Sequence, residues 1–168
     1  MNNLKMKKFI ITYHGGYKSL NINDLKPGIY TTSDINGAMW YINRNLEKNE
    51  KAWLTTLSIK YSNPLSLYNK SDFKKYWIPI LNNTNIKYTF KEYDDGSYSF
   101  ESSDIIKNGG YIENNPFDLI YIDEFLMNVI NYNYDIIIGY DTLINYDIPI
   151  YIPLKINNVK ILKNDLYF

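Results

Sequence analysis

The sequence predicts an α+β fold in which short, mostly antiparallel strands form split sheets with flanking helices. Several short stretches are rich in β-branched and aromatic residues, which is typical of strands. Two longer stretches, beginning near residues 35 and 116, repeat apolar residues at helical spacing. Strands and helices do not alternate regularly, as they would in a doubly wound parallel fold. The resulting pattern favours a mixed sheet.

The first half of the chain contains four expected elements. Residues 8–13 form a strand that we expect to end at Gly15-Gly16, and residues 29–31 form a second strand after the Pro27-Gly28 turn. A helix follows, with Thr32 or Ser33 as its cap. Residues 52–61 read as a third strand, which Asn63-Pro64 breaks and residues 65–67 resume.

The second half begins with a weaker helix over 72–81, which Pro79 is expected to end or kink. Residues 88–100 read as a hairpin around the turn 94–97. Asn115-Pro116 is a favourable helix start. Residues 134–138 form a buried strand that Gly139 stops, with Asp135 interpreted as a solvent residue at its start. A loop over 140–147 then leads to strands over 148–154 and 159–162.

The bulk properties limit the class of protein. A chain of 168 residues is expected to form a single domain over 1–168. The absence of cysteine excludes disulfides and thiolate chemistry, and a single histidine excludes a multi-histidine metal site. The formal net charge is zero, which argues against a nucleic acid or an anionic membrane as partner. Without a signal peptide or a membrane-length apolar run, we expect a cytoplasmic protein; its oligomeric state is not indicated.

The most informative stretch is Tyr13-His14-Gly15-Gly16, because it places the only histidine at a strand end beside two glycines. Glycine allows a flat ligand to approach the backbone closely. If the first two strands pair and the helix lies behind them, Tyr30 and Tyr41 border the same place. Two aromatic faces could then enclose a planar heterocycle. The alternative is that His14 is a strand-end histidine and that the tyrosines, two among 18, serve packing.

These segments resemble a known family. Tyr13-His14-Gly15, Gly28-Ile29-Tyr30-Thr31-Thr32 and Ala38-Met39-Trp40-Tyr41 resemble the His-Tyr-Glu type of the ADP-ribosyltransferase fold, shared by diphtheria-toxin-like enzymes and poly(ADP-ribose) polymerases. The segments 57–65 and 134–137 are similar to parts of the small bacterial and phage ART-PolyVal-type domains.

The resemblance implies that NAD is the substrate. His14 would hydrogen-bond the adenine-side ribose, and the Gly15 backbone would hold the nicotinamide carboxamide. Tyr30 and Tyr41 would border and stack on the nicotinamide ring, and Tyr41 would also belong to the catalytic residues. The residues expected near the ribose are Thr31 and Thr32.

The sequence departs from the family at its third motif. The family carries a glutamate at the start of a late strand, where it stabilises positive charge as the glycosidic bond breaks. This chain has no glutamate after Glu124. Asp147, just before the expected strand, or Asp141, in the expected loop, would have to replace it as the catalytic carboxylate. The other possibility is that neither acid is catalytic.

Three functions follow as expectations. The first is a mono-ADP-ribosyltransferase that modifies a macromolecule, most simply a host or cellular protein, as a bacterial toxin or phage effector would. The second is a catalytically inactive module of the same fold that binds a nucleotide or a protein. The third is a transferase that modifies nucleic acid.

Overall fold

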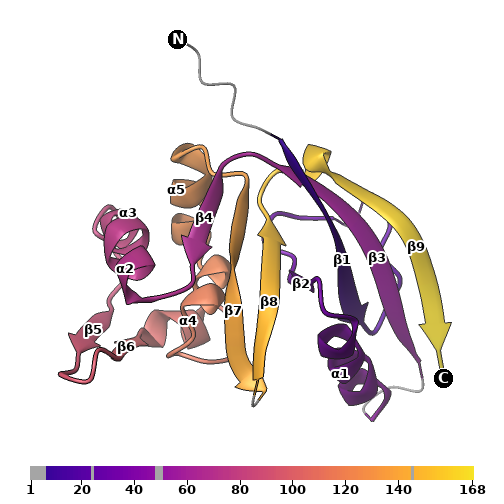
Figure 1. Ribbon diagram of the computed structural model, residues 1–168, viewed down its shortest axis with the longest axis horizontal. Helices are drawn as coiled ribbons and strands as arrows, with labels where there is room; N and C mark the ends of the chain where they lie inside the picture. The colour runs from indigo at the N-terminus through magenta and orange to yellow at the C-terminus, as the bar shows by residue number, and fades with distance from the viewer. Residues whose placement is uncertain (1–6, 24, 48–50, 145) are drawn as a thin grey trace. The chain divides into compact units, whose positions relative to one another are not determined.

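The computed structural model describes residues 7–23, 25–47, 51–144 and 146–168, and the chain divides into two compact units. Unit 1 comprises residues 1–65 and 135–168, and unit 2 comprises residues 66–134. Sheets with flanking helices confirm the predicted α+β class (Figure 1). The single domain over 1–168 stays a prediction, because two compact units can still unfold together.

Unit 1 is built on a sheet with the strand order β4-β7-β8-β2-β1-β3-β9. The register pairs that join β1, β2, β3, β7, β8 and β9 are all antiparallel. The sheet narrows at the two-residue strand β2, which pairs with β1 only at Tyr13↔Thr32. The strands are β1 (Lys8–Gly16), β2 (Thr31–Thr32), β3 (Ala52–Tyr61), β4 (Pro64–Leu67), β7 (Ile136–Ile144), β8 (Tyr146–Pro153) and β9 (Val159–Tyr167).

The helix of unit 1 is α1 (Ile35–Leu46), as its apolar spacing predicted. The predicted cap, Thr32 or Ser33, is wrong, because Asp34, directly before the helix, accepts the hydrogen bond from Asn36 N–H at 2.9 Å. The Thr32 hydroxyl instead accepts one from the Asp34 N–H at 3.0 Å. Ala38 and Ile42 are buried against Ala52 and Leu54 of β3. A short 3-10 turn, η3 (Ile156–Asn158), precedes β9.

Two apolar clusters lie on the two faces of this sheet. One joins α1 to β3. The other joins β3, β7 and β9 to the segment before β2, through Leu20, Leu25, Leu57, Ile59, Ile136, Ile138 and Val159. Directly paired residues of antiparallel strands share a face. The pairs Thr12↔Leu57 and His14↔Thr55 therefore place the His14 side chain on the face away from α1.

A buried carboxylate lies where the chain leaves and re-enters unit 1. Asp135, 5% exposed, accepts hydrogen bonds from Ser62 N–H (2.7 Å), the Ser62 hydroxyl (3.1 Å) and Asn63 N–H (2.9 Å). The Asp135 N–H donates to the Asn63 carbonyl at 3.0 Å. The interpretation of Asp135 as a solvent residue is therefore wrong; it is a cross-link between two chain segments.

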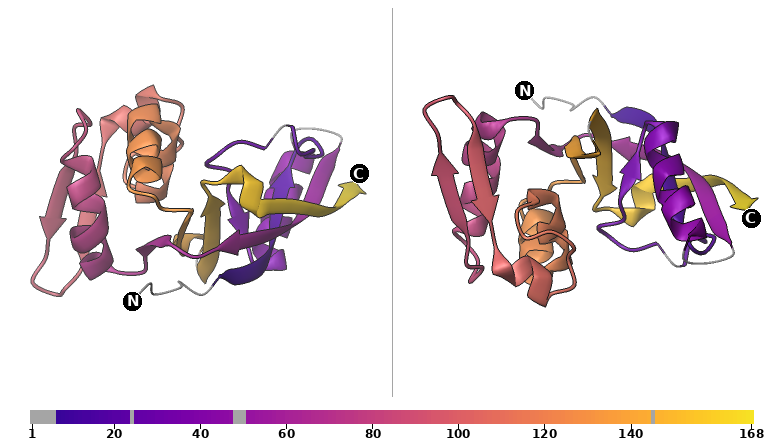
Figure 2. Two further views of the ribbon diagram at one scale, coloured as in Figure 1. Left: turned by 90° about the horizontal axis from the view of Figure 1, so that it is seen from above. Right: turned by 90° about the horizontal axis from the view of Figure 1, so that it is seen from below.

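Unit 2 comprises helical segments and the hairpin of β5 (Thr89–Glu92) and β6 (Tyr98–Glu101), as Figure 2 shows. Its core is aromatic. Phe73 lies 5.2 Å from Phe90 and 5.3 Å from Phe100 between ring centroids, and Trp77 lies 5.5 Å from Phe125. The helical segments are α2 (Lys70–Asp72), η1 (Phe73–Trp77), α3 (Ile78–Leu81), α4 (Ser103–Lys107), η2 (Pro116–Tyr121) and α5 (Asp123–Asn131).

The helices of unit 2 agree with the prediction in part. Asn115 caps η2 through a 3.1 Å bond from Phe117 N–H, but this stretch is a 3-10 helix and the α-helix begins at Asp123. The segment 70–81 continues through Pro79, which lies in the first turn of α3 after the wider π-turn of η1. Proline is tolerated in a first turn because the N–H that it lacks has little role there.

The strand ends differ from the prediction. β1 continues through Gly15 and Gly16, which pair with Leu54 and Trp53. β7 continues through Gly139, which pairs with Ile150. The expected loop over 140–147 is wrong, because β7 and β8 form a hairpin and Asp141 pairs with Ile148. Within the described ranges, no helix is both long and apolar enough to cross a bilayer.

Candidate functional site

The site predicted around His14 lies in unit 1, and its centre is a side-chain-to-backbone hydrogen bond. His14 Nδ1 lies 2.8 Å from the Tyr30 carbonyl oxygen. A carbonyl can only accept, so Nδ1 carries the proton and Nε2 is the acceptor nitrogen of the neutral ring. The bond fixes the ring orientation and connects the end of β1 to the segment just before β2.

Gly15 brings the end of β1 against α1. A Cβ at this position would lie 2.6 Å from the Ala38 carbonyl oxygen and 3.0 Å from Tyr41 Cβ. The absence of a side chain therefore lets β1 pack directly on the helix that carries Tyr41. The Tyr41 ring packs edge-on against Trp40, with 4.9 Å between centroids.

His14 and Tyr41 approach β1 from opposite faces. Alternation along a strand turns neighbouring side chains to opposite sides, so His14 points away from the α1 face that Gly15 and Tyr41 share. A molecule in contact with both would have to lie along the edge or the end of β1. The predicted enclosure of one ring between Tyr30 and Tyr41 stays a prediction, but His14 does not share a face of the sheet with Tyr41.

Thr31 and Thr32 are buried in β2 and serve the fold. The Thr31 hydroxyl donates to the Tyr151 carbonyl at 2.6 Å, which ties β2 to β8. Thr32 supports the start of α1 through its hydroxyl. Both threonines directly follow Tyr30 in the sequence, as the prediction required. Their hydroxyl groups, however, already form hydrogen bonds within the protein.

The two acids lie in the β7–β8 hairpin. Asp147 is exposed in β8, three residues before Ile150, which pairs with Thr32. Three residues correspond to about 10 Å along a strand. Asp141 lies in β7, and its side chain is outside the described part of the chain. Both acids therefore lie in paired strands, where the backbone holds them in place, and not in the expected loop.

Gly16 lies beside the His14 ring, although the predicted site residues did not include it. A Cβ there would lie 3.0 Å from His14 Nε2, so the glycine leaves space next to the acceptor nitrogen. The signal was present in the glycine pair, but only the structure shows which glycine serves the helix and which serves the histidine.

Burial lowers the pKa of His14 below its ordinary value of 6.5, and the Tyr30 carbonyl opposes this only in part. His14 is therefore neutral at pH 7. The unfolded chain binds a proton at this residue near pH 6.5 and the folded chain does so only at lower pH, so unfolding is favoured as the pH falls below about 6.5.

We expect that His14→Asn reduces the acid sensitivity of the fold. Asparagine can still donate to the Tyr30 carbonyl, but it does not titrate. Thermal melts between pH 7.5 and pH 5.5 should show a smaller loss of stability for the variant than for the wild type. Because His14 is the only histidine, equal losses in the two proteins would contradict this assignment.

Two open hollows lie away from the predicted site. One, of about 600 Å³, is in unit 2 beside β6 and the segment 111–114. The other, of about 500 Å³, is in unit 1 between residues 20–22 and β9. No predicted site residue lines either hollow. Among the described residues there is also no group of three acidic or histidine side chains that could hold a metal ion.

Comparisons with protein-family models, with curated proteins and with solved structures found no significant match to this chain.

Proposed function

We propose that the end of β1 binds the nicotinamide half of NAD and that the protein is a mono-ADP-ribosyltransferase. The observation that carries the proposal is that the Tyr30 carbonyl holds the neutral His14 ring at the end of β1, with its Nε2 beside Gly16, while Gly15 seats the Tyr41 helix against the other face of the same strand end. A neutral acceptor nitrogen suits a ribose hydroxyl, which can donate to it. Gly16 has no side chain beside the His14 ring, which leaves room there for a flat amide, whereas α1 fills the space beside Gly15.

In the proposed reaction the bond between nicotinamide and the ribose C1′ breaks, and the electron pair leaves with nicotinamide. An acceptor nucleophile then bonds to C1′ and loses a proton. Positive charge develops on the ribose in between, so a carboxylate near C1′ would lower the barrier. Asp147 is the first candidate and Asp141 the second.

A second function, nucleotide binding without turnover, is favoured by the position of these acids. Asp147 is exposed and lies in a paired strand about 10 Å from the level of Thr32 along β8. A carboxylate at that distance has to approach the ribose through movement of the hairpin. Without such movement the protein would hold NAD or ADP-ribose and leave the glycosidic bond intact.

The test combines calorimetry with NAD and ADP-ribose, release of nicotinamide, and labelling of cell lysate with tagged NAD. We expect wild-type binding and turnover, and a loss of at least tenfold in NAD affinity for Gly16→Ala, whose methyl group would cover His14 Nε2. Lys18→Ala, an exposed change in the following loop, is the control.

The outcomes separate the two functions. Binding without nicotinamide release assigns the protein to the nucleotide-binding class and overturns catalysis. No heat with either nucleotide overturns both. Retention of wild-type affinity by Gly16→Ala would remove His14 from the site.

A further inference from the structure

The zero net charge of the chain conceals two opposite charges. Unit 1 contains 12 lysine and arginine residues against 8 aspartate and glutamate residues, a net charge of +4. Unit 2 contains 6 against 10, a net charge of −4. The sequence argued against a nucleic-acid partner because the net charge of the whole chain is zero. That argument does not apply to unit 1, whose own net charge is positive.

One face of the strands β1, β3 and β9 is open over part of its length. The pairs Phe9↔Lys60, Ile11↔Ser58 and Ser58↔Lys160 place these residues on the α1 face of the sheet. Helix α1 packs at the other end of β1, as Figure 1 shows, where Tyr13 lies against its apolar cluster. We call this surface the open face; its residues are Phe9, Ile11, Ser58, Lys60, Lys160 and Lys163.

The open face exposes aromatic and apolar side chains. Phe9 is 69% exposed and Ile11 is 45% exposed, although both lie within a paired strand. The two residues are two positions apart on one strand, so their side chains lie side by side on the same face. Together they form a small exposed apolar patch.

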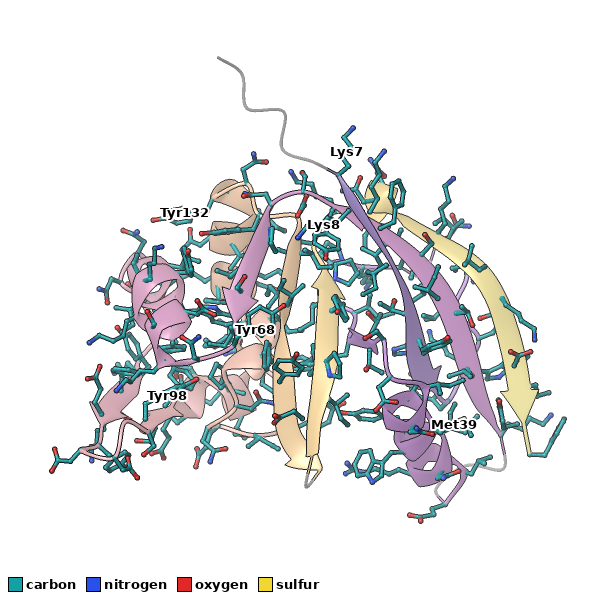
Figure 3. The ribbon with its side chains drawn as sticks, in the orientation of Figure 1. Lys7, Lys8, Met39, Tyr68, Tyr98 and Tyr132 are labelled. Carbon is teal, nitrogen blue, oxygen red and sulfur yellow. The ribbon has the colours of Figure 1, made fainter. Side chains whose placement is uncertain are left out.

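Lysines surround the apolar residues. Lys60 Nζ lies 5.4 Å from the centre of the Phe9 ring, and Lys160 is exposed on the outer strand. Lys163 also lies on this face, because it is the register partner of Thr56 on β3. Its Nζ forms an ion pair with the Asp165 carboxylate at 2.7 Å. Lys7 and Lys8 are exposed at the start of β1 (Figure 3). Lys8 directly precedes Phe9 in the strand, so its side chain lies on the opposite face. Lysines on the two neighbouring strands thus accompany the exposed aromatic ring.

We infer that the open face binds single-stranded nucleic acid. Sheets that bind single strands combine an exposed aromatic ring, on which a base stacks, with lysines that meet the phosphates. Phe9 supplies the ring, and Lys60 and Lys160 supply charges on the next two strands, at about 5 Å per strand. A flat ring can stack only on an unpaired base, so a duplex does not fit. The inference is independent of NAD binding, because it concerns other residues and can be measured without NAD.

The experiment measures the anisotropy of a fluorescein-labelled 12-nucleotide oligo(U) or oligo(dT) titrated with the full chain, at 50 and 200 mM salt. With two phosphates neutralised by Lys60 and Lys160, the logarithmic salt slope should be about −1.4, which is a loss of roughly 7-fold in affinity over this range. Phe9→Ala should weaken binding by roughly 5- to 150-fold through loss of one stacked base. The double variant K60Q/K160Q should reduce the slope to less than half.

The matched control is K87Q/K91Q, which removes two exposed lysines from unit 2 and should leave the affinity unchanged. The inference is overturned if neither oligonucleotide binds at 50 mM salt, if the control weakens binding as much as K60Q/K160Q, or if Phe9→Ala binds as tightly as the wild type. Equal binding of a 12-base-pair duplex would also overturn it. Displacement of the oligonucleotide from the wild type by an equimolar acidic peptide would assign the face to a protein partner instead.

Discussion

Replacement of Asp135 by alanine is expected to destabilise the protein by roughly 3 kcal/mol or more. The carboxylate accepts three hydrogen bonds, two from the backbone N–H groups of Ser62 and Asn63 and one from the Ser62 hydroxyl. Each buried donor left without a partner costs about 1–3 kcal/mol, and bonds to a charged acceptor are at the upper end. Alanine removes every acceptor at once.

Urea unfolding at pH 7, followed by tryptophan fluorescence, measures this effect. Asp94→Ala is the matched control, because Asp94 is exposed in the hairpin turn and surface substitutions change stability by about 0.5 kcal/mol or less. Asp135→Asn adds a second comparison: it keeps the shape but turns one acceptor into a donor that faces an N–H group. A midpoint for Asp135→Ala as high as that of Asp94→Ala would contradict the cross-link.

The second large effect is expected for Gly15→Ala. The new methyl group would meet the Ala38 carbonyl oxygen at 2.6 Å, and this atom belongs to the backbone of a paired helix turn that cannot rotate away. Overpacking of this kind costs about 1–3 kcal/mol. The helix would have to move away from β1 and would take Tyr41 with it, so we also expect weaker NAD binding if the proposed function holds.

Gly16→Ala is the matched comparison for stability. Its methyl group would meet only the end of the His14 ring, at 3.0 Å, and the nearest backbone oxygen at 3.7 Å. Thermal melts should therefore show a larger loss for Gly15→Ala than for Gly16→Ala. The reverse order, or equal melting temperatures, would show that α1 does not pack on Gly15 as described.

Local patterns were sufficient to predict most elements of the fold. The apolar spacing of Ile35 to Leu46 defined α1, and the alternation of residues 52–61 defined β3. Both depend only on neighbours in the sequence. The strand ends at Gly16 and Gly139 could not be predicted in this way, because partners on other strands keep these glycines in the sheet.

Only part of the candidate site could be predicted. The sequence indicated His14 and its glycines, but the opposite faces of His14 and Tyr41 follow from the register of β1 and the packing of α1. The partners of Asp135 are 72 and 73 residues away along the chain, so no local pattern contains them. The net charge of each unit could be counted from the sequence only once the unit boundaries were known. Those boundaries follow from contacts between segments that are distant in the sequence.

The position of Asp135 also bears on how such a protein could arise. Unit 2 leaves unit 1 after Leu65 and returns at Asp135, and the hydrogen bonds between Asn63 and Asp135 hold these two points side by side. When the points at which the chain leaves and re-enters a unit are already adjacent, closing the loop between them costs little additional entropy, even if that loop is long. Residues 66–134 therefore have the topology of an insertion, which could be exchanged or lengthened while the sheet that carries His14 keeps its own connections.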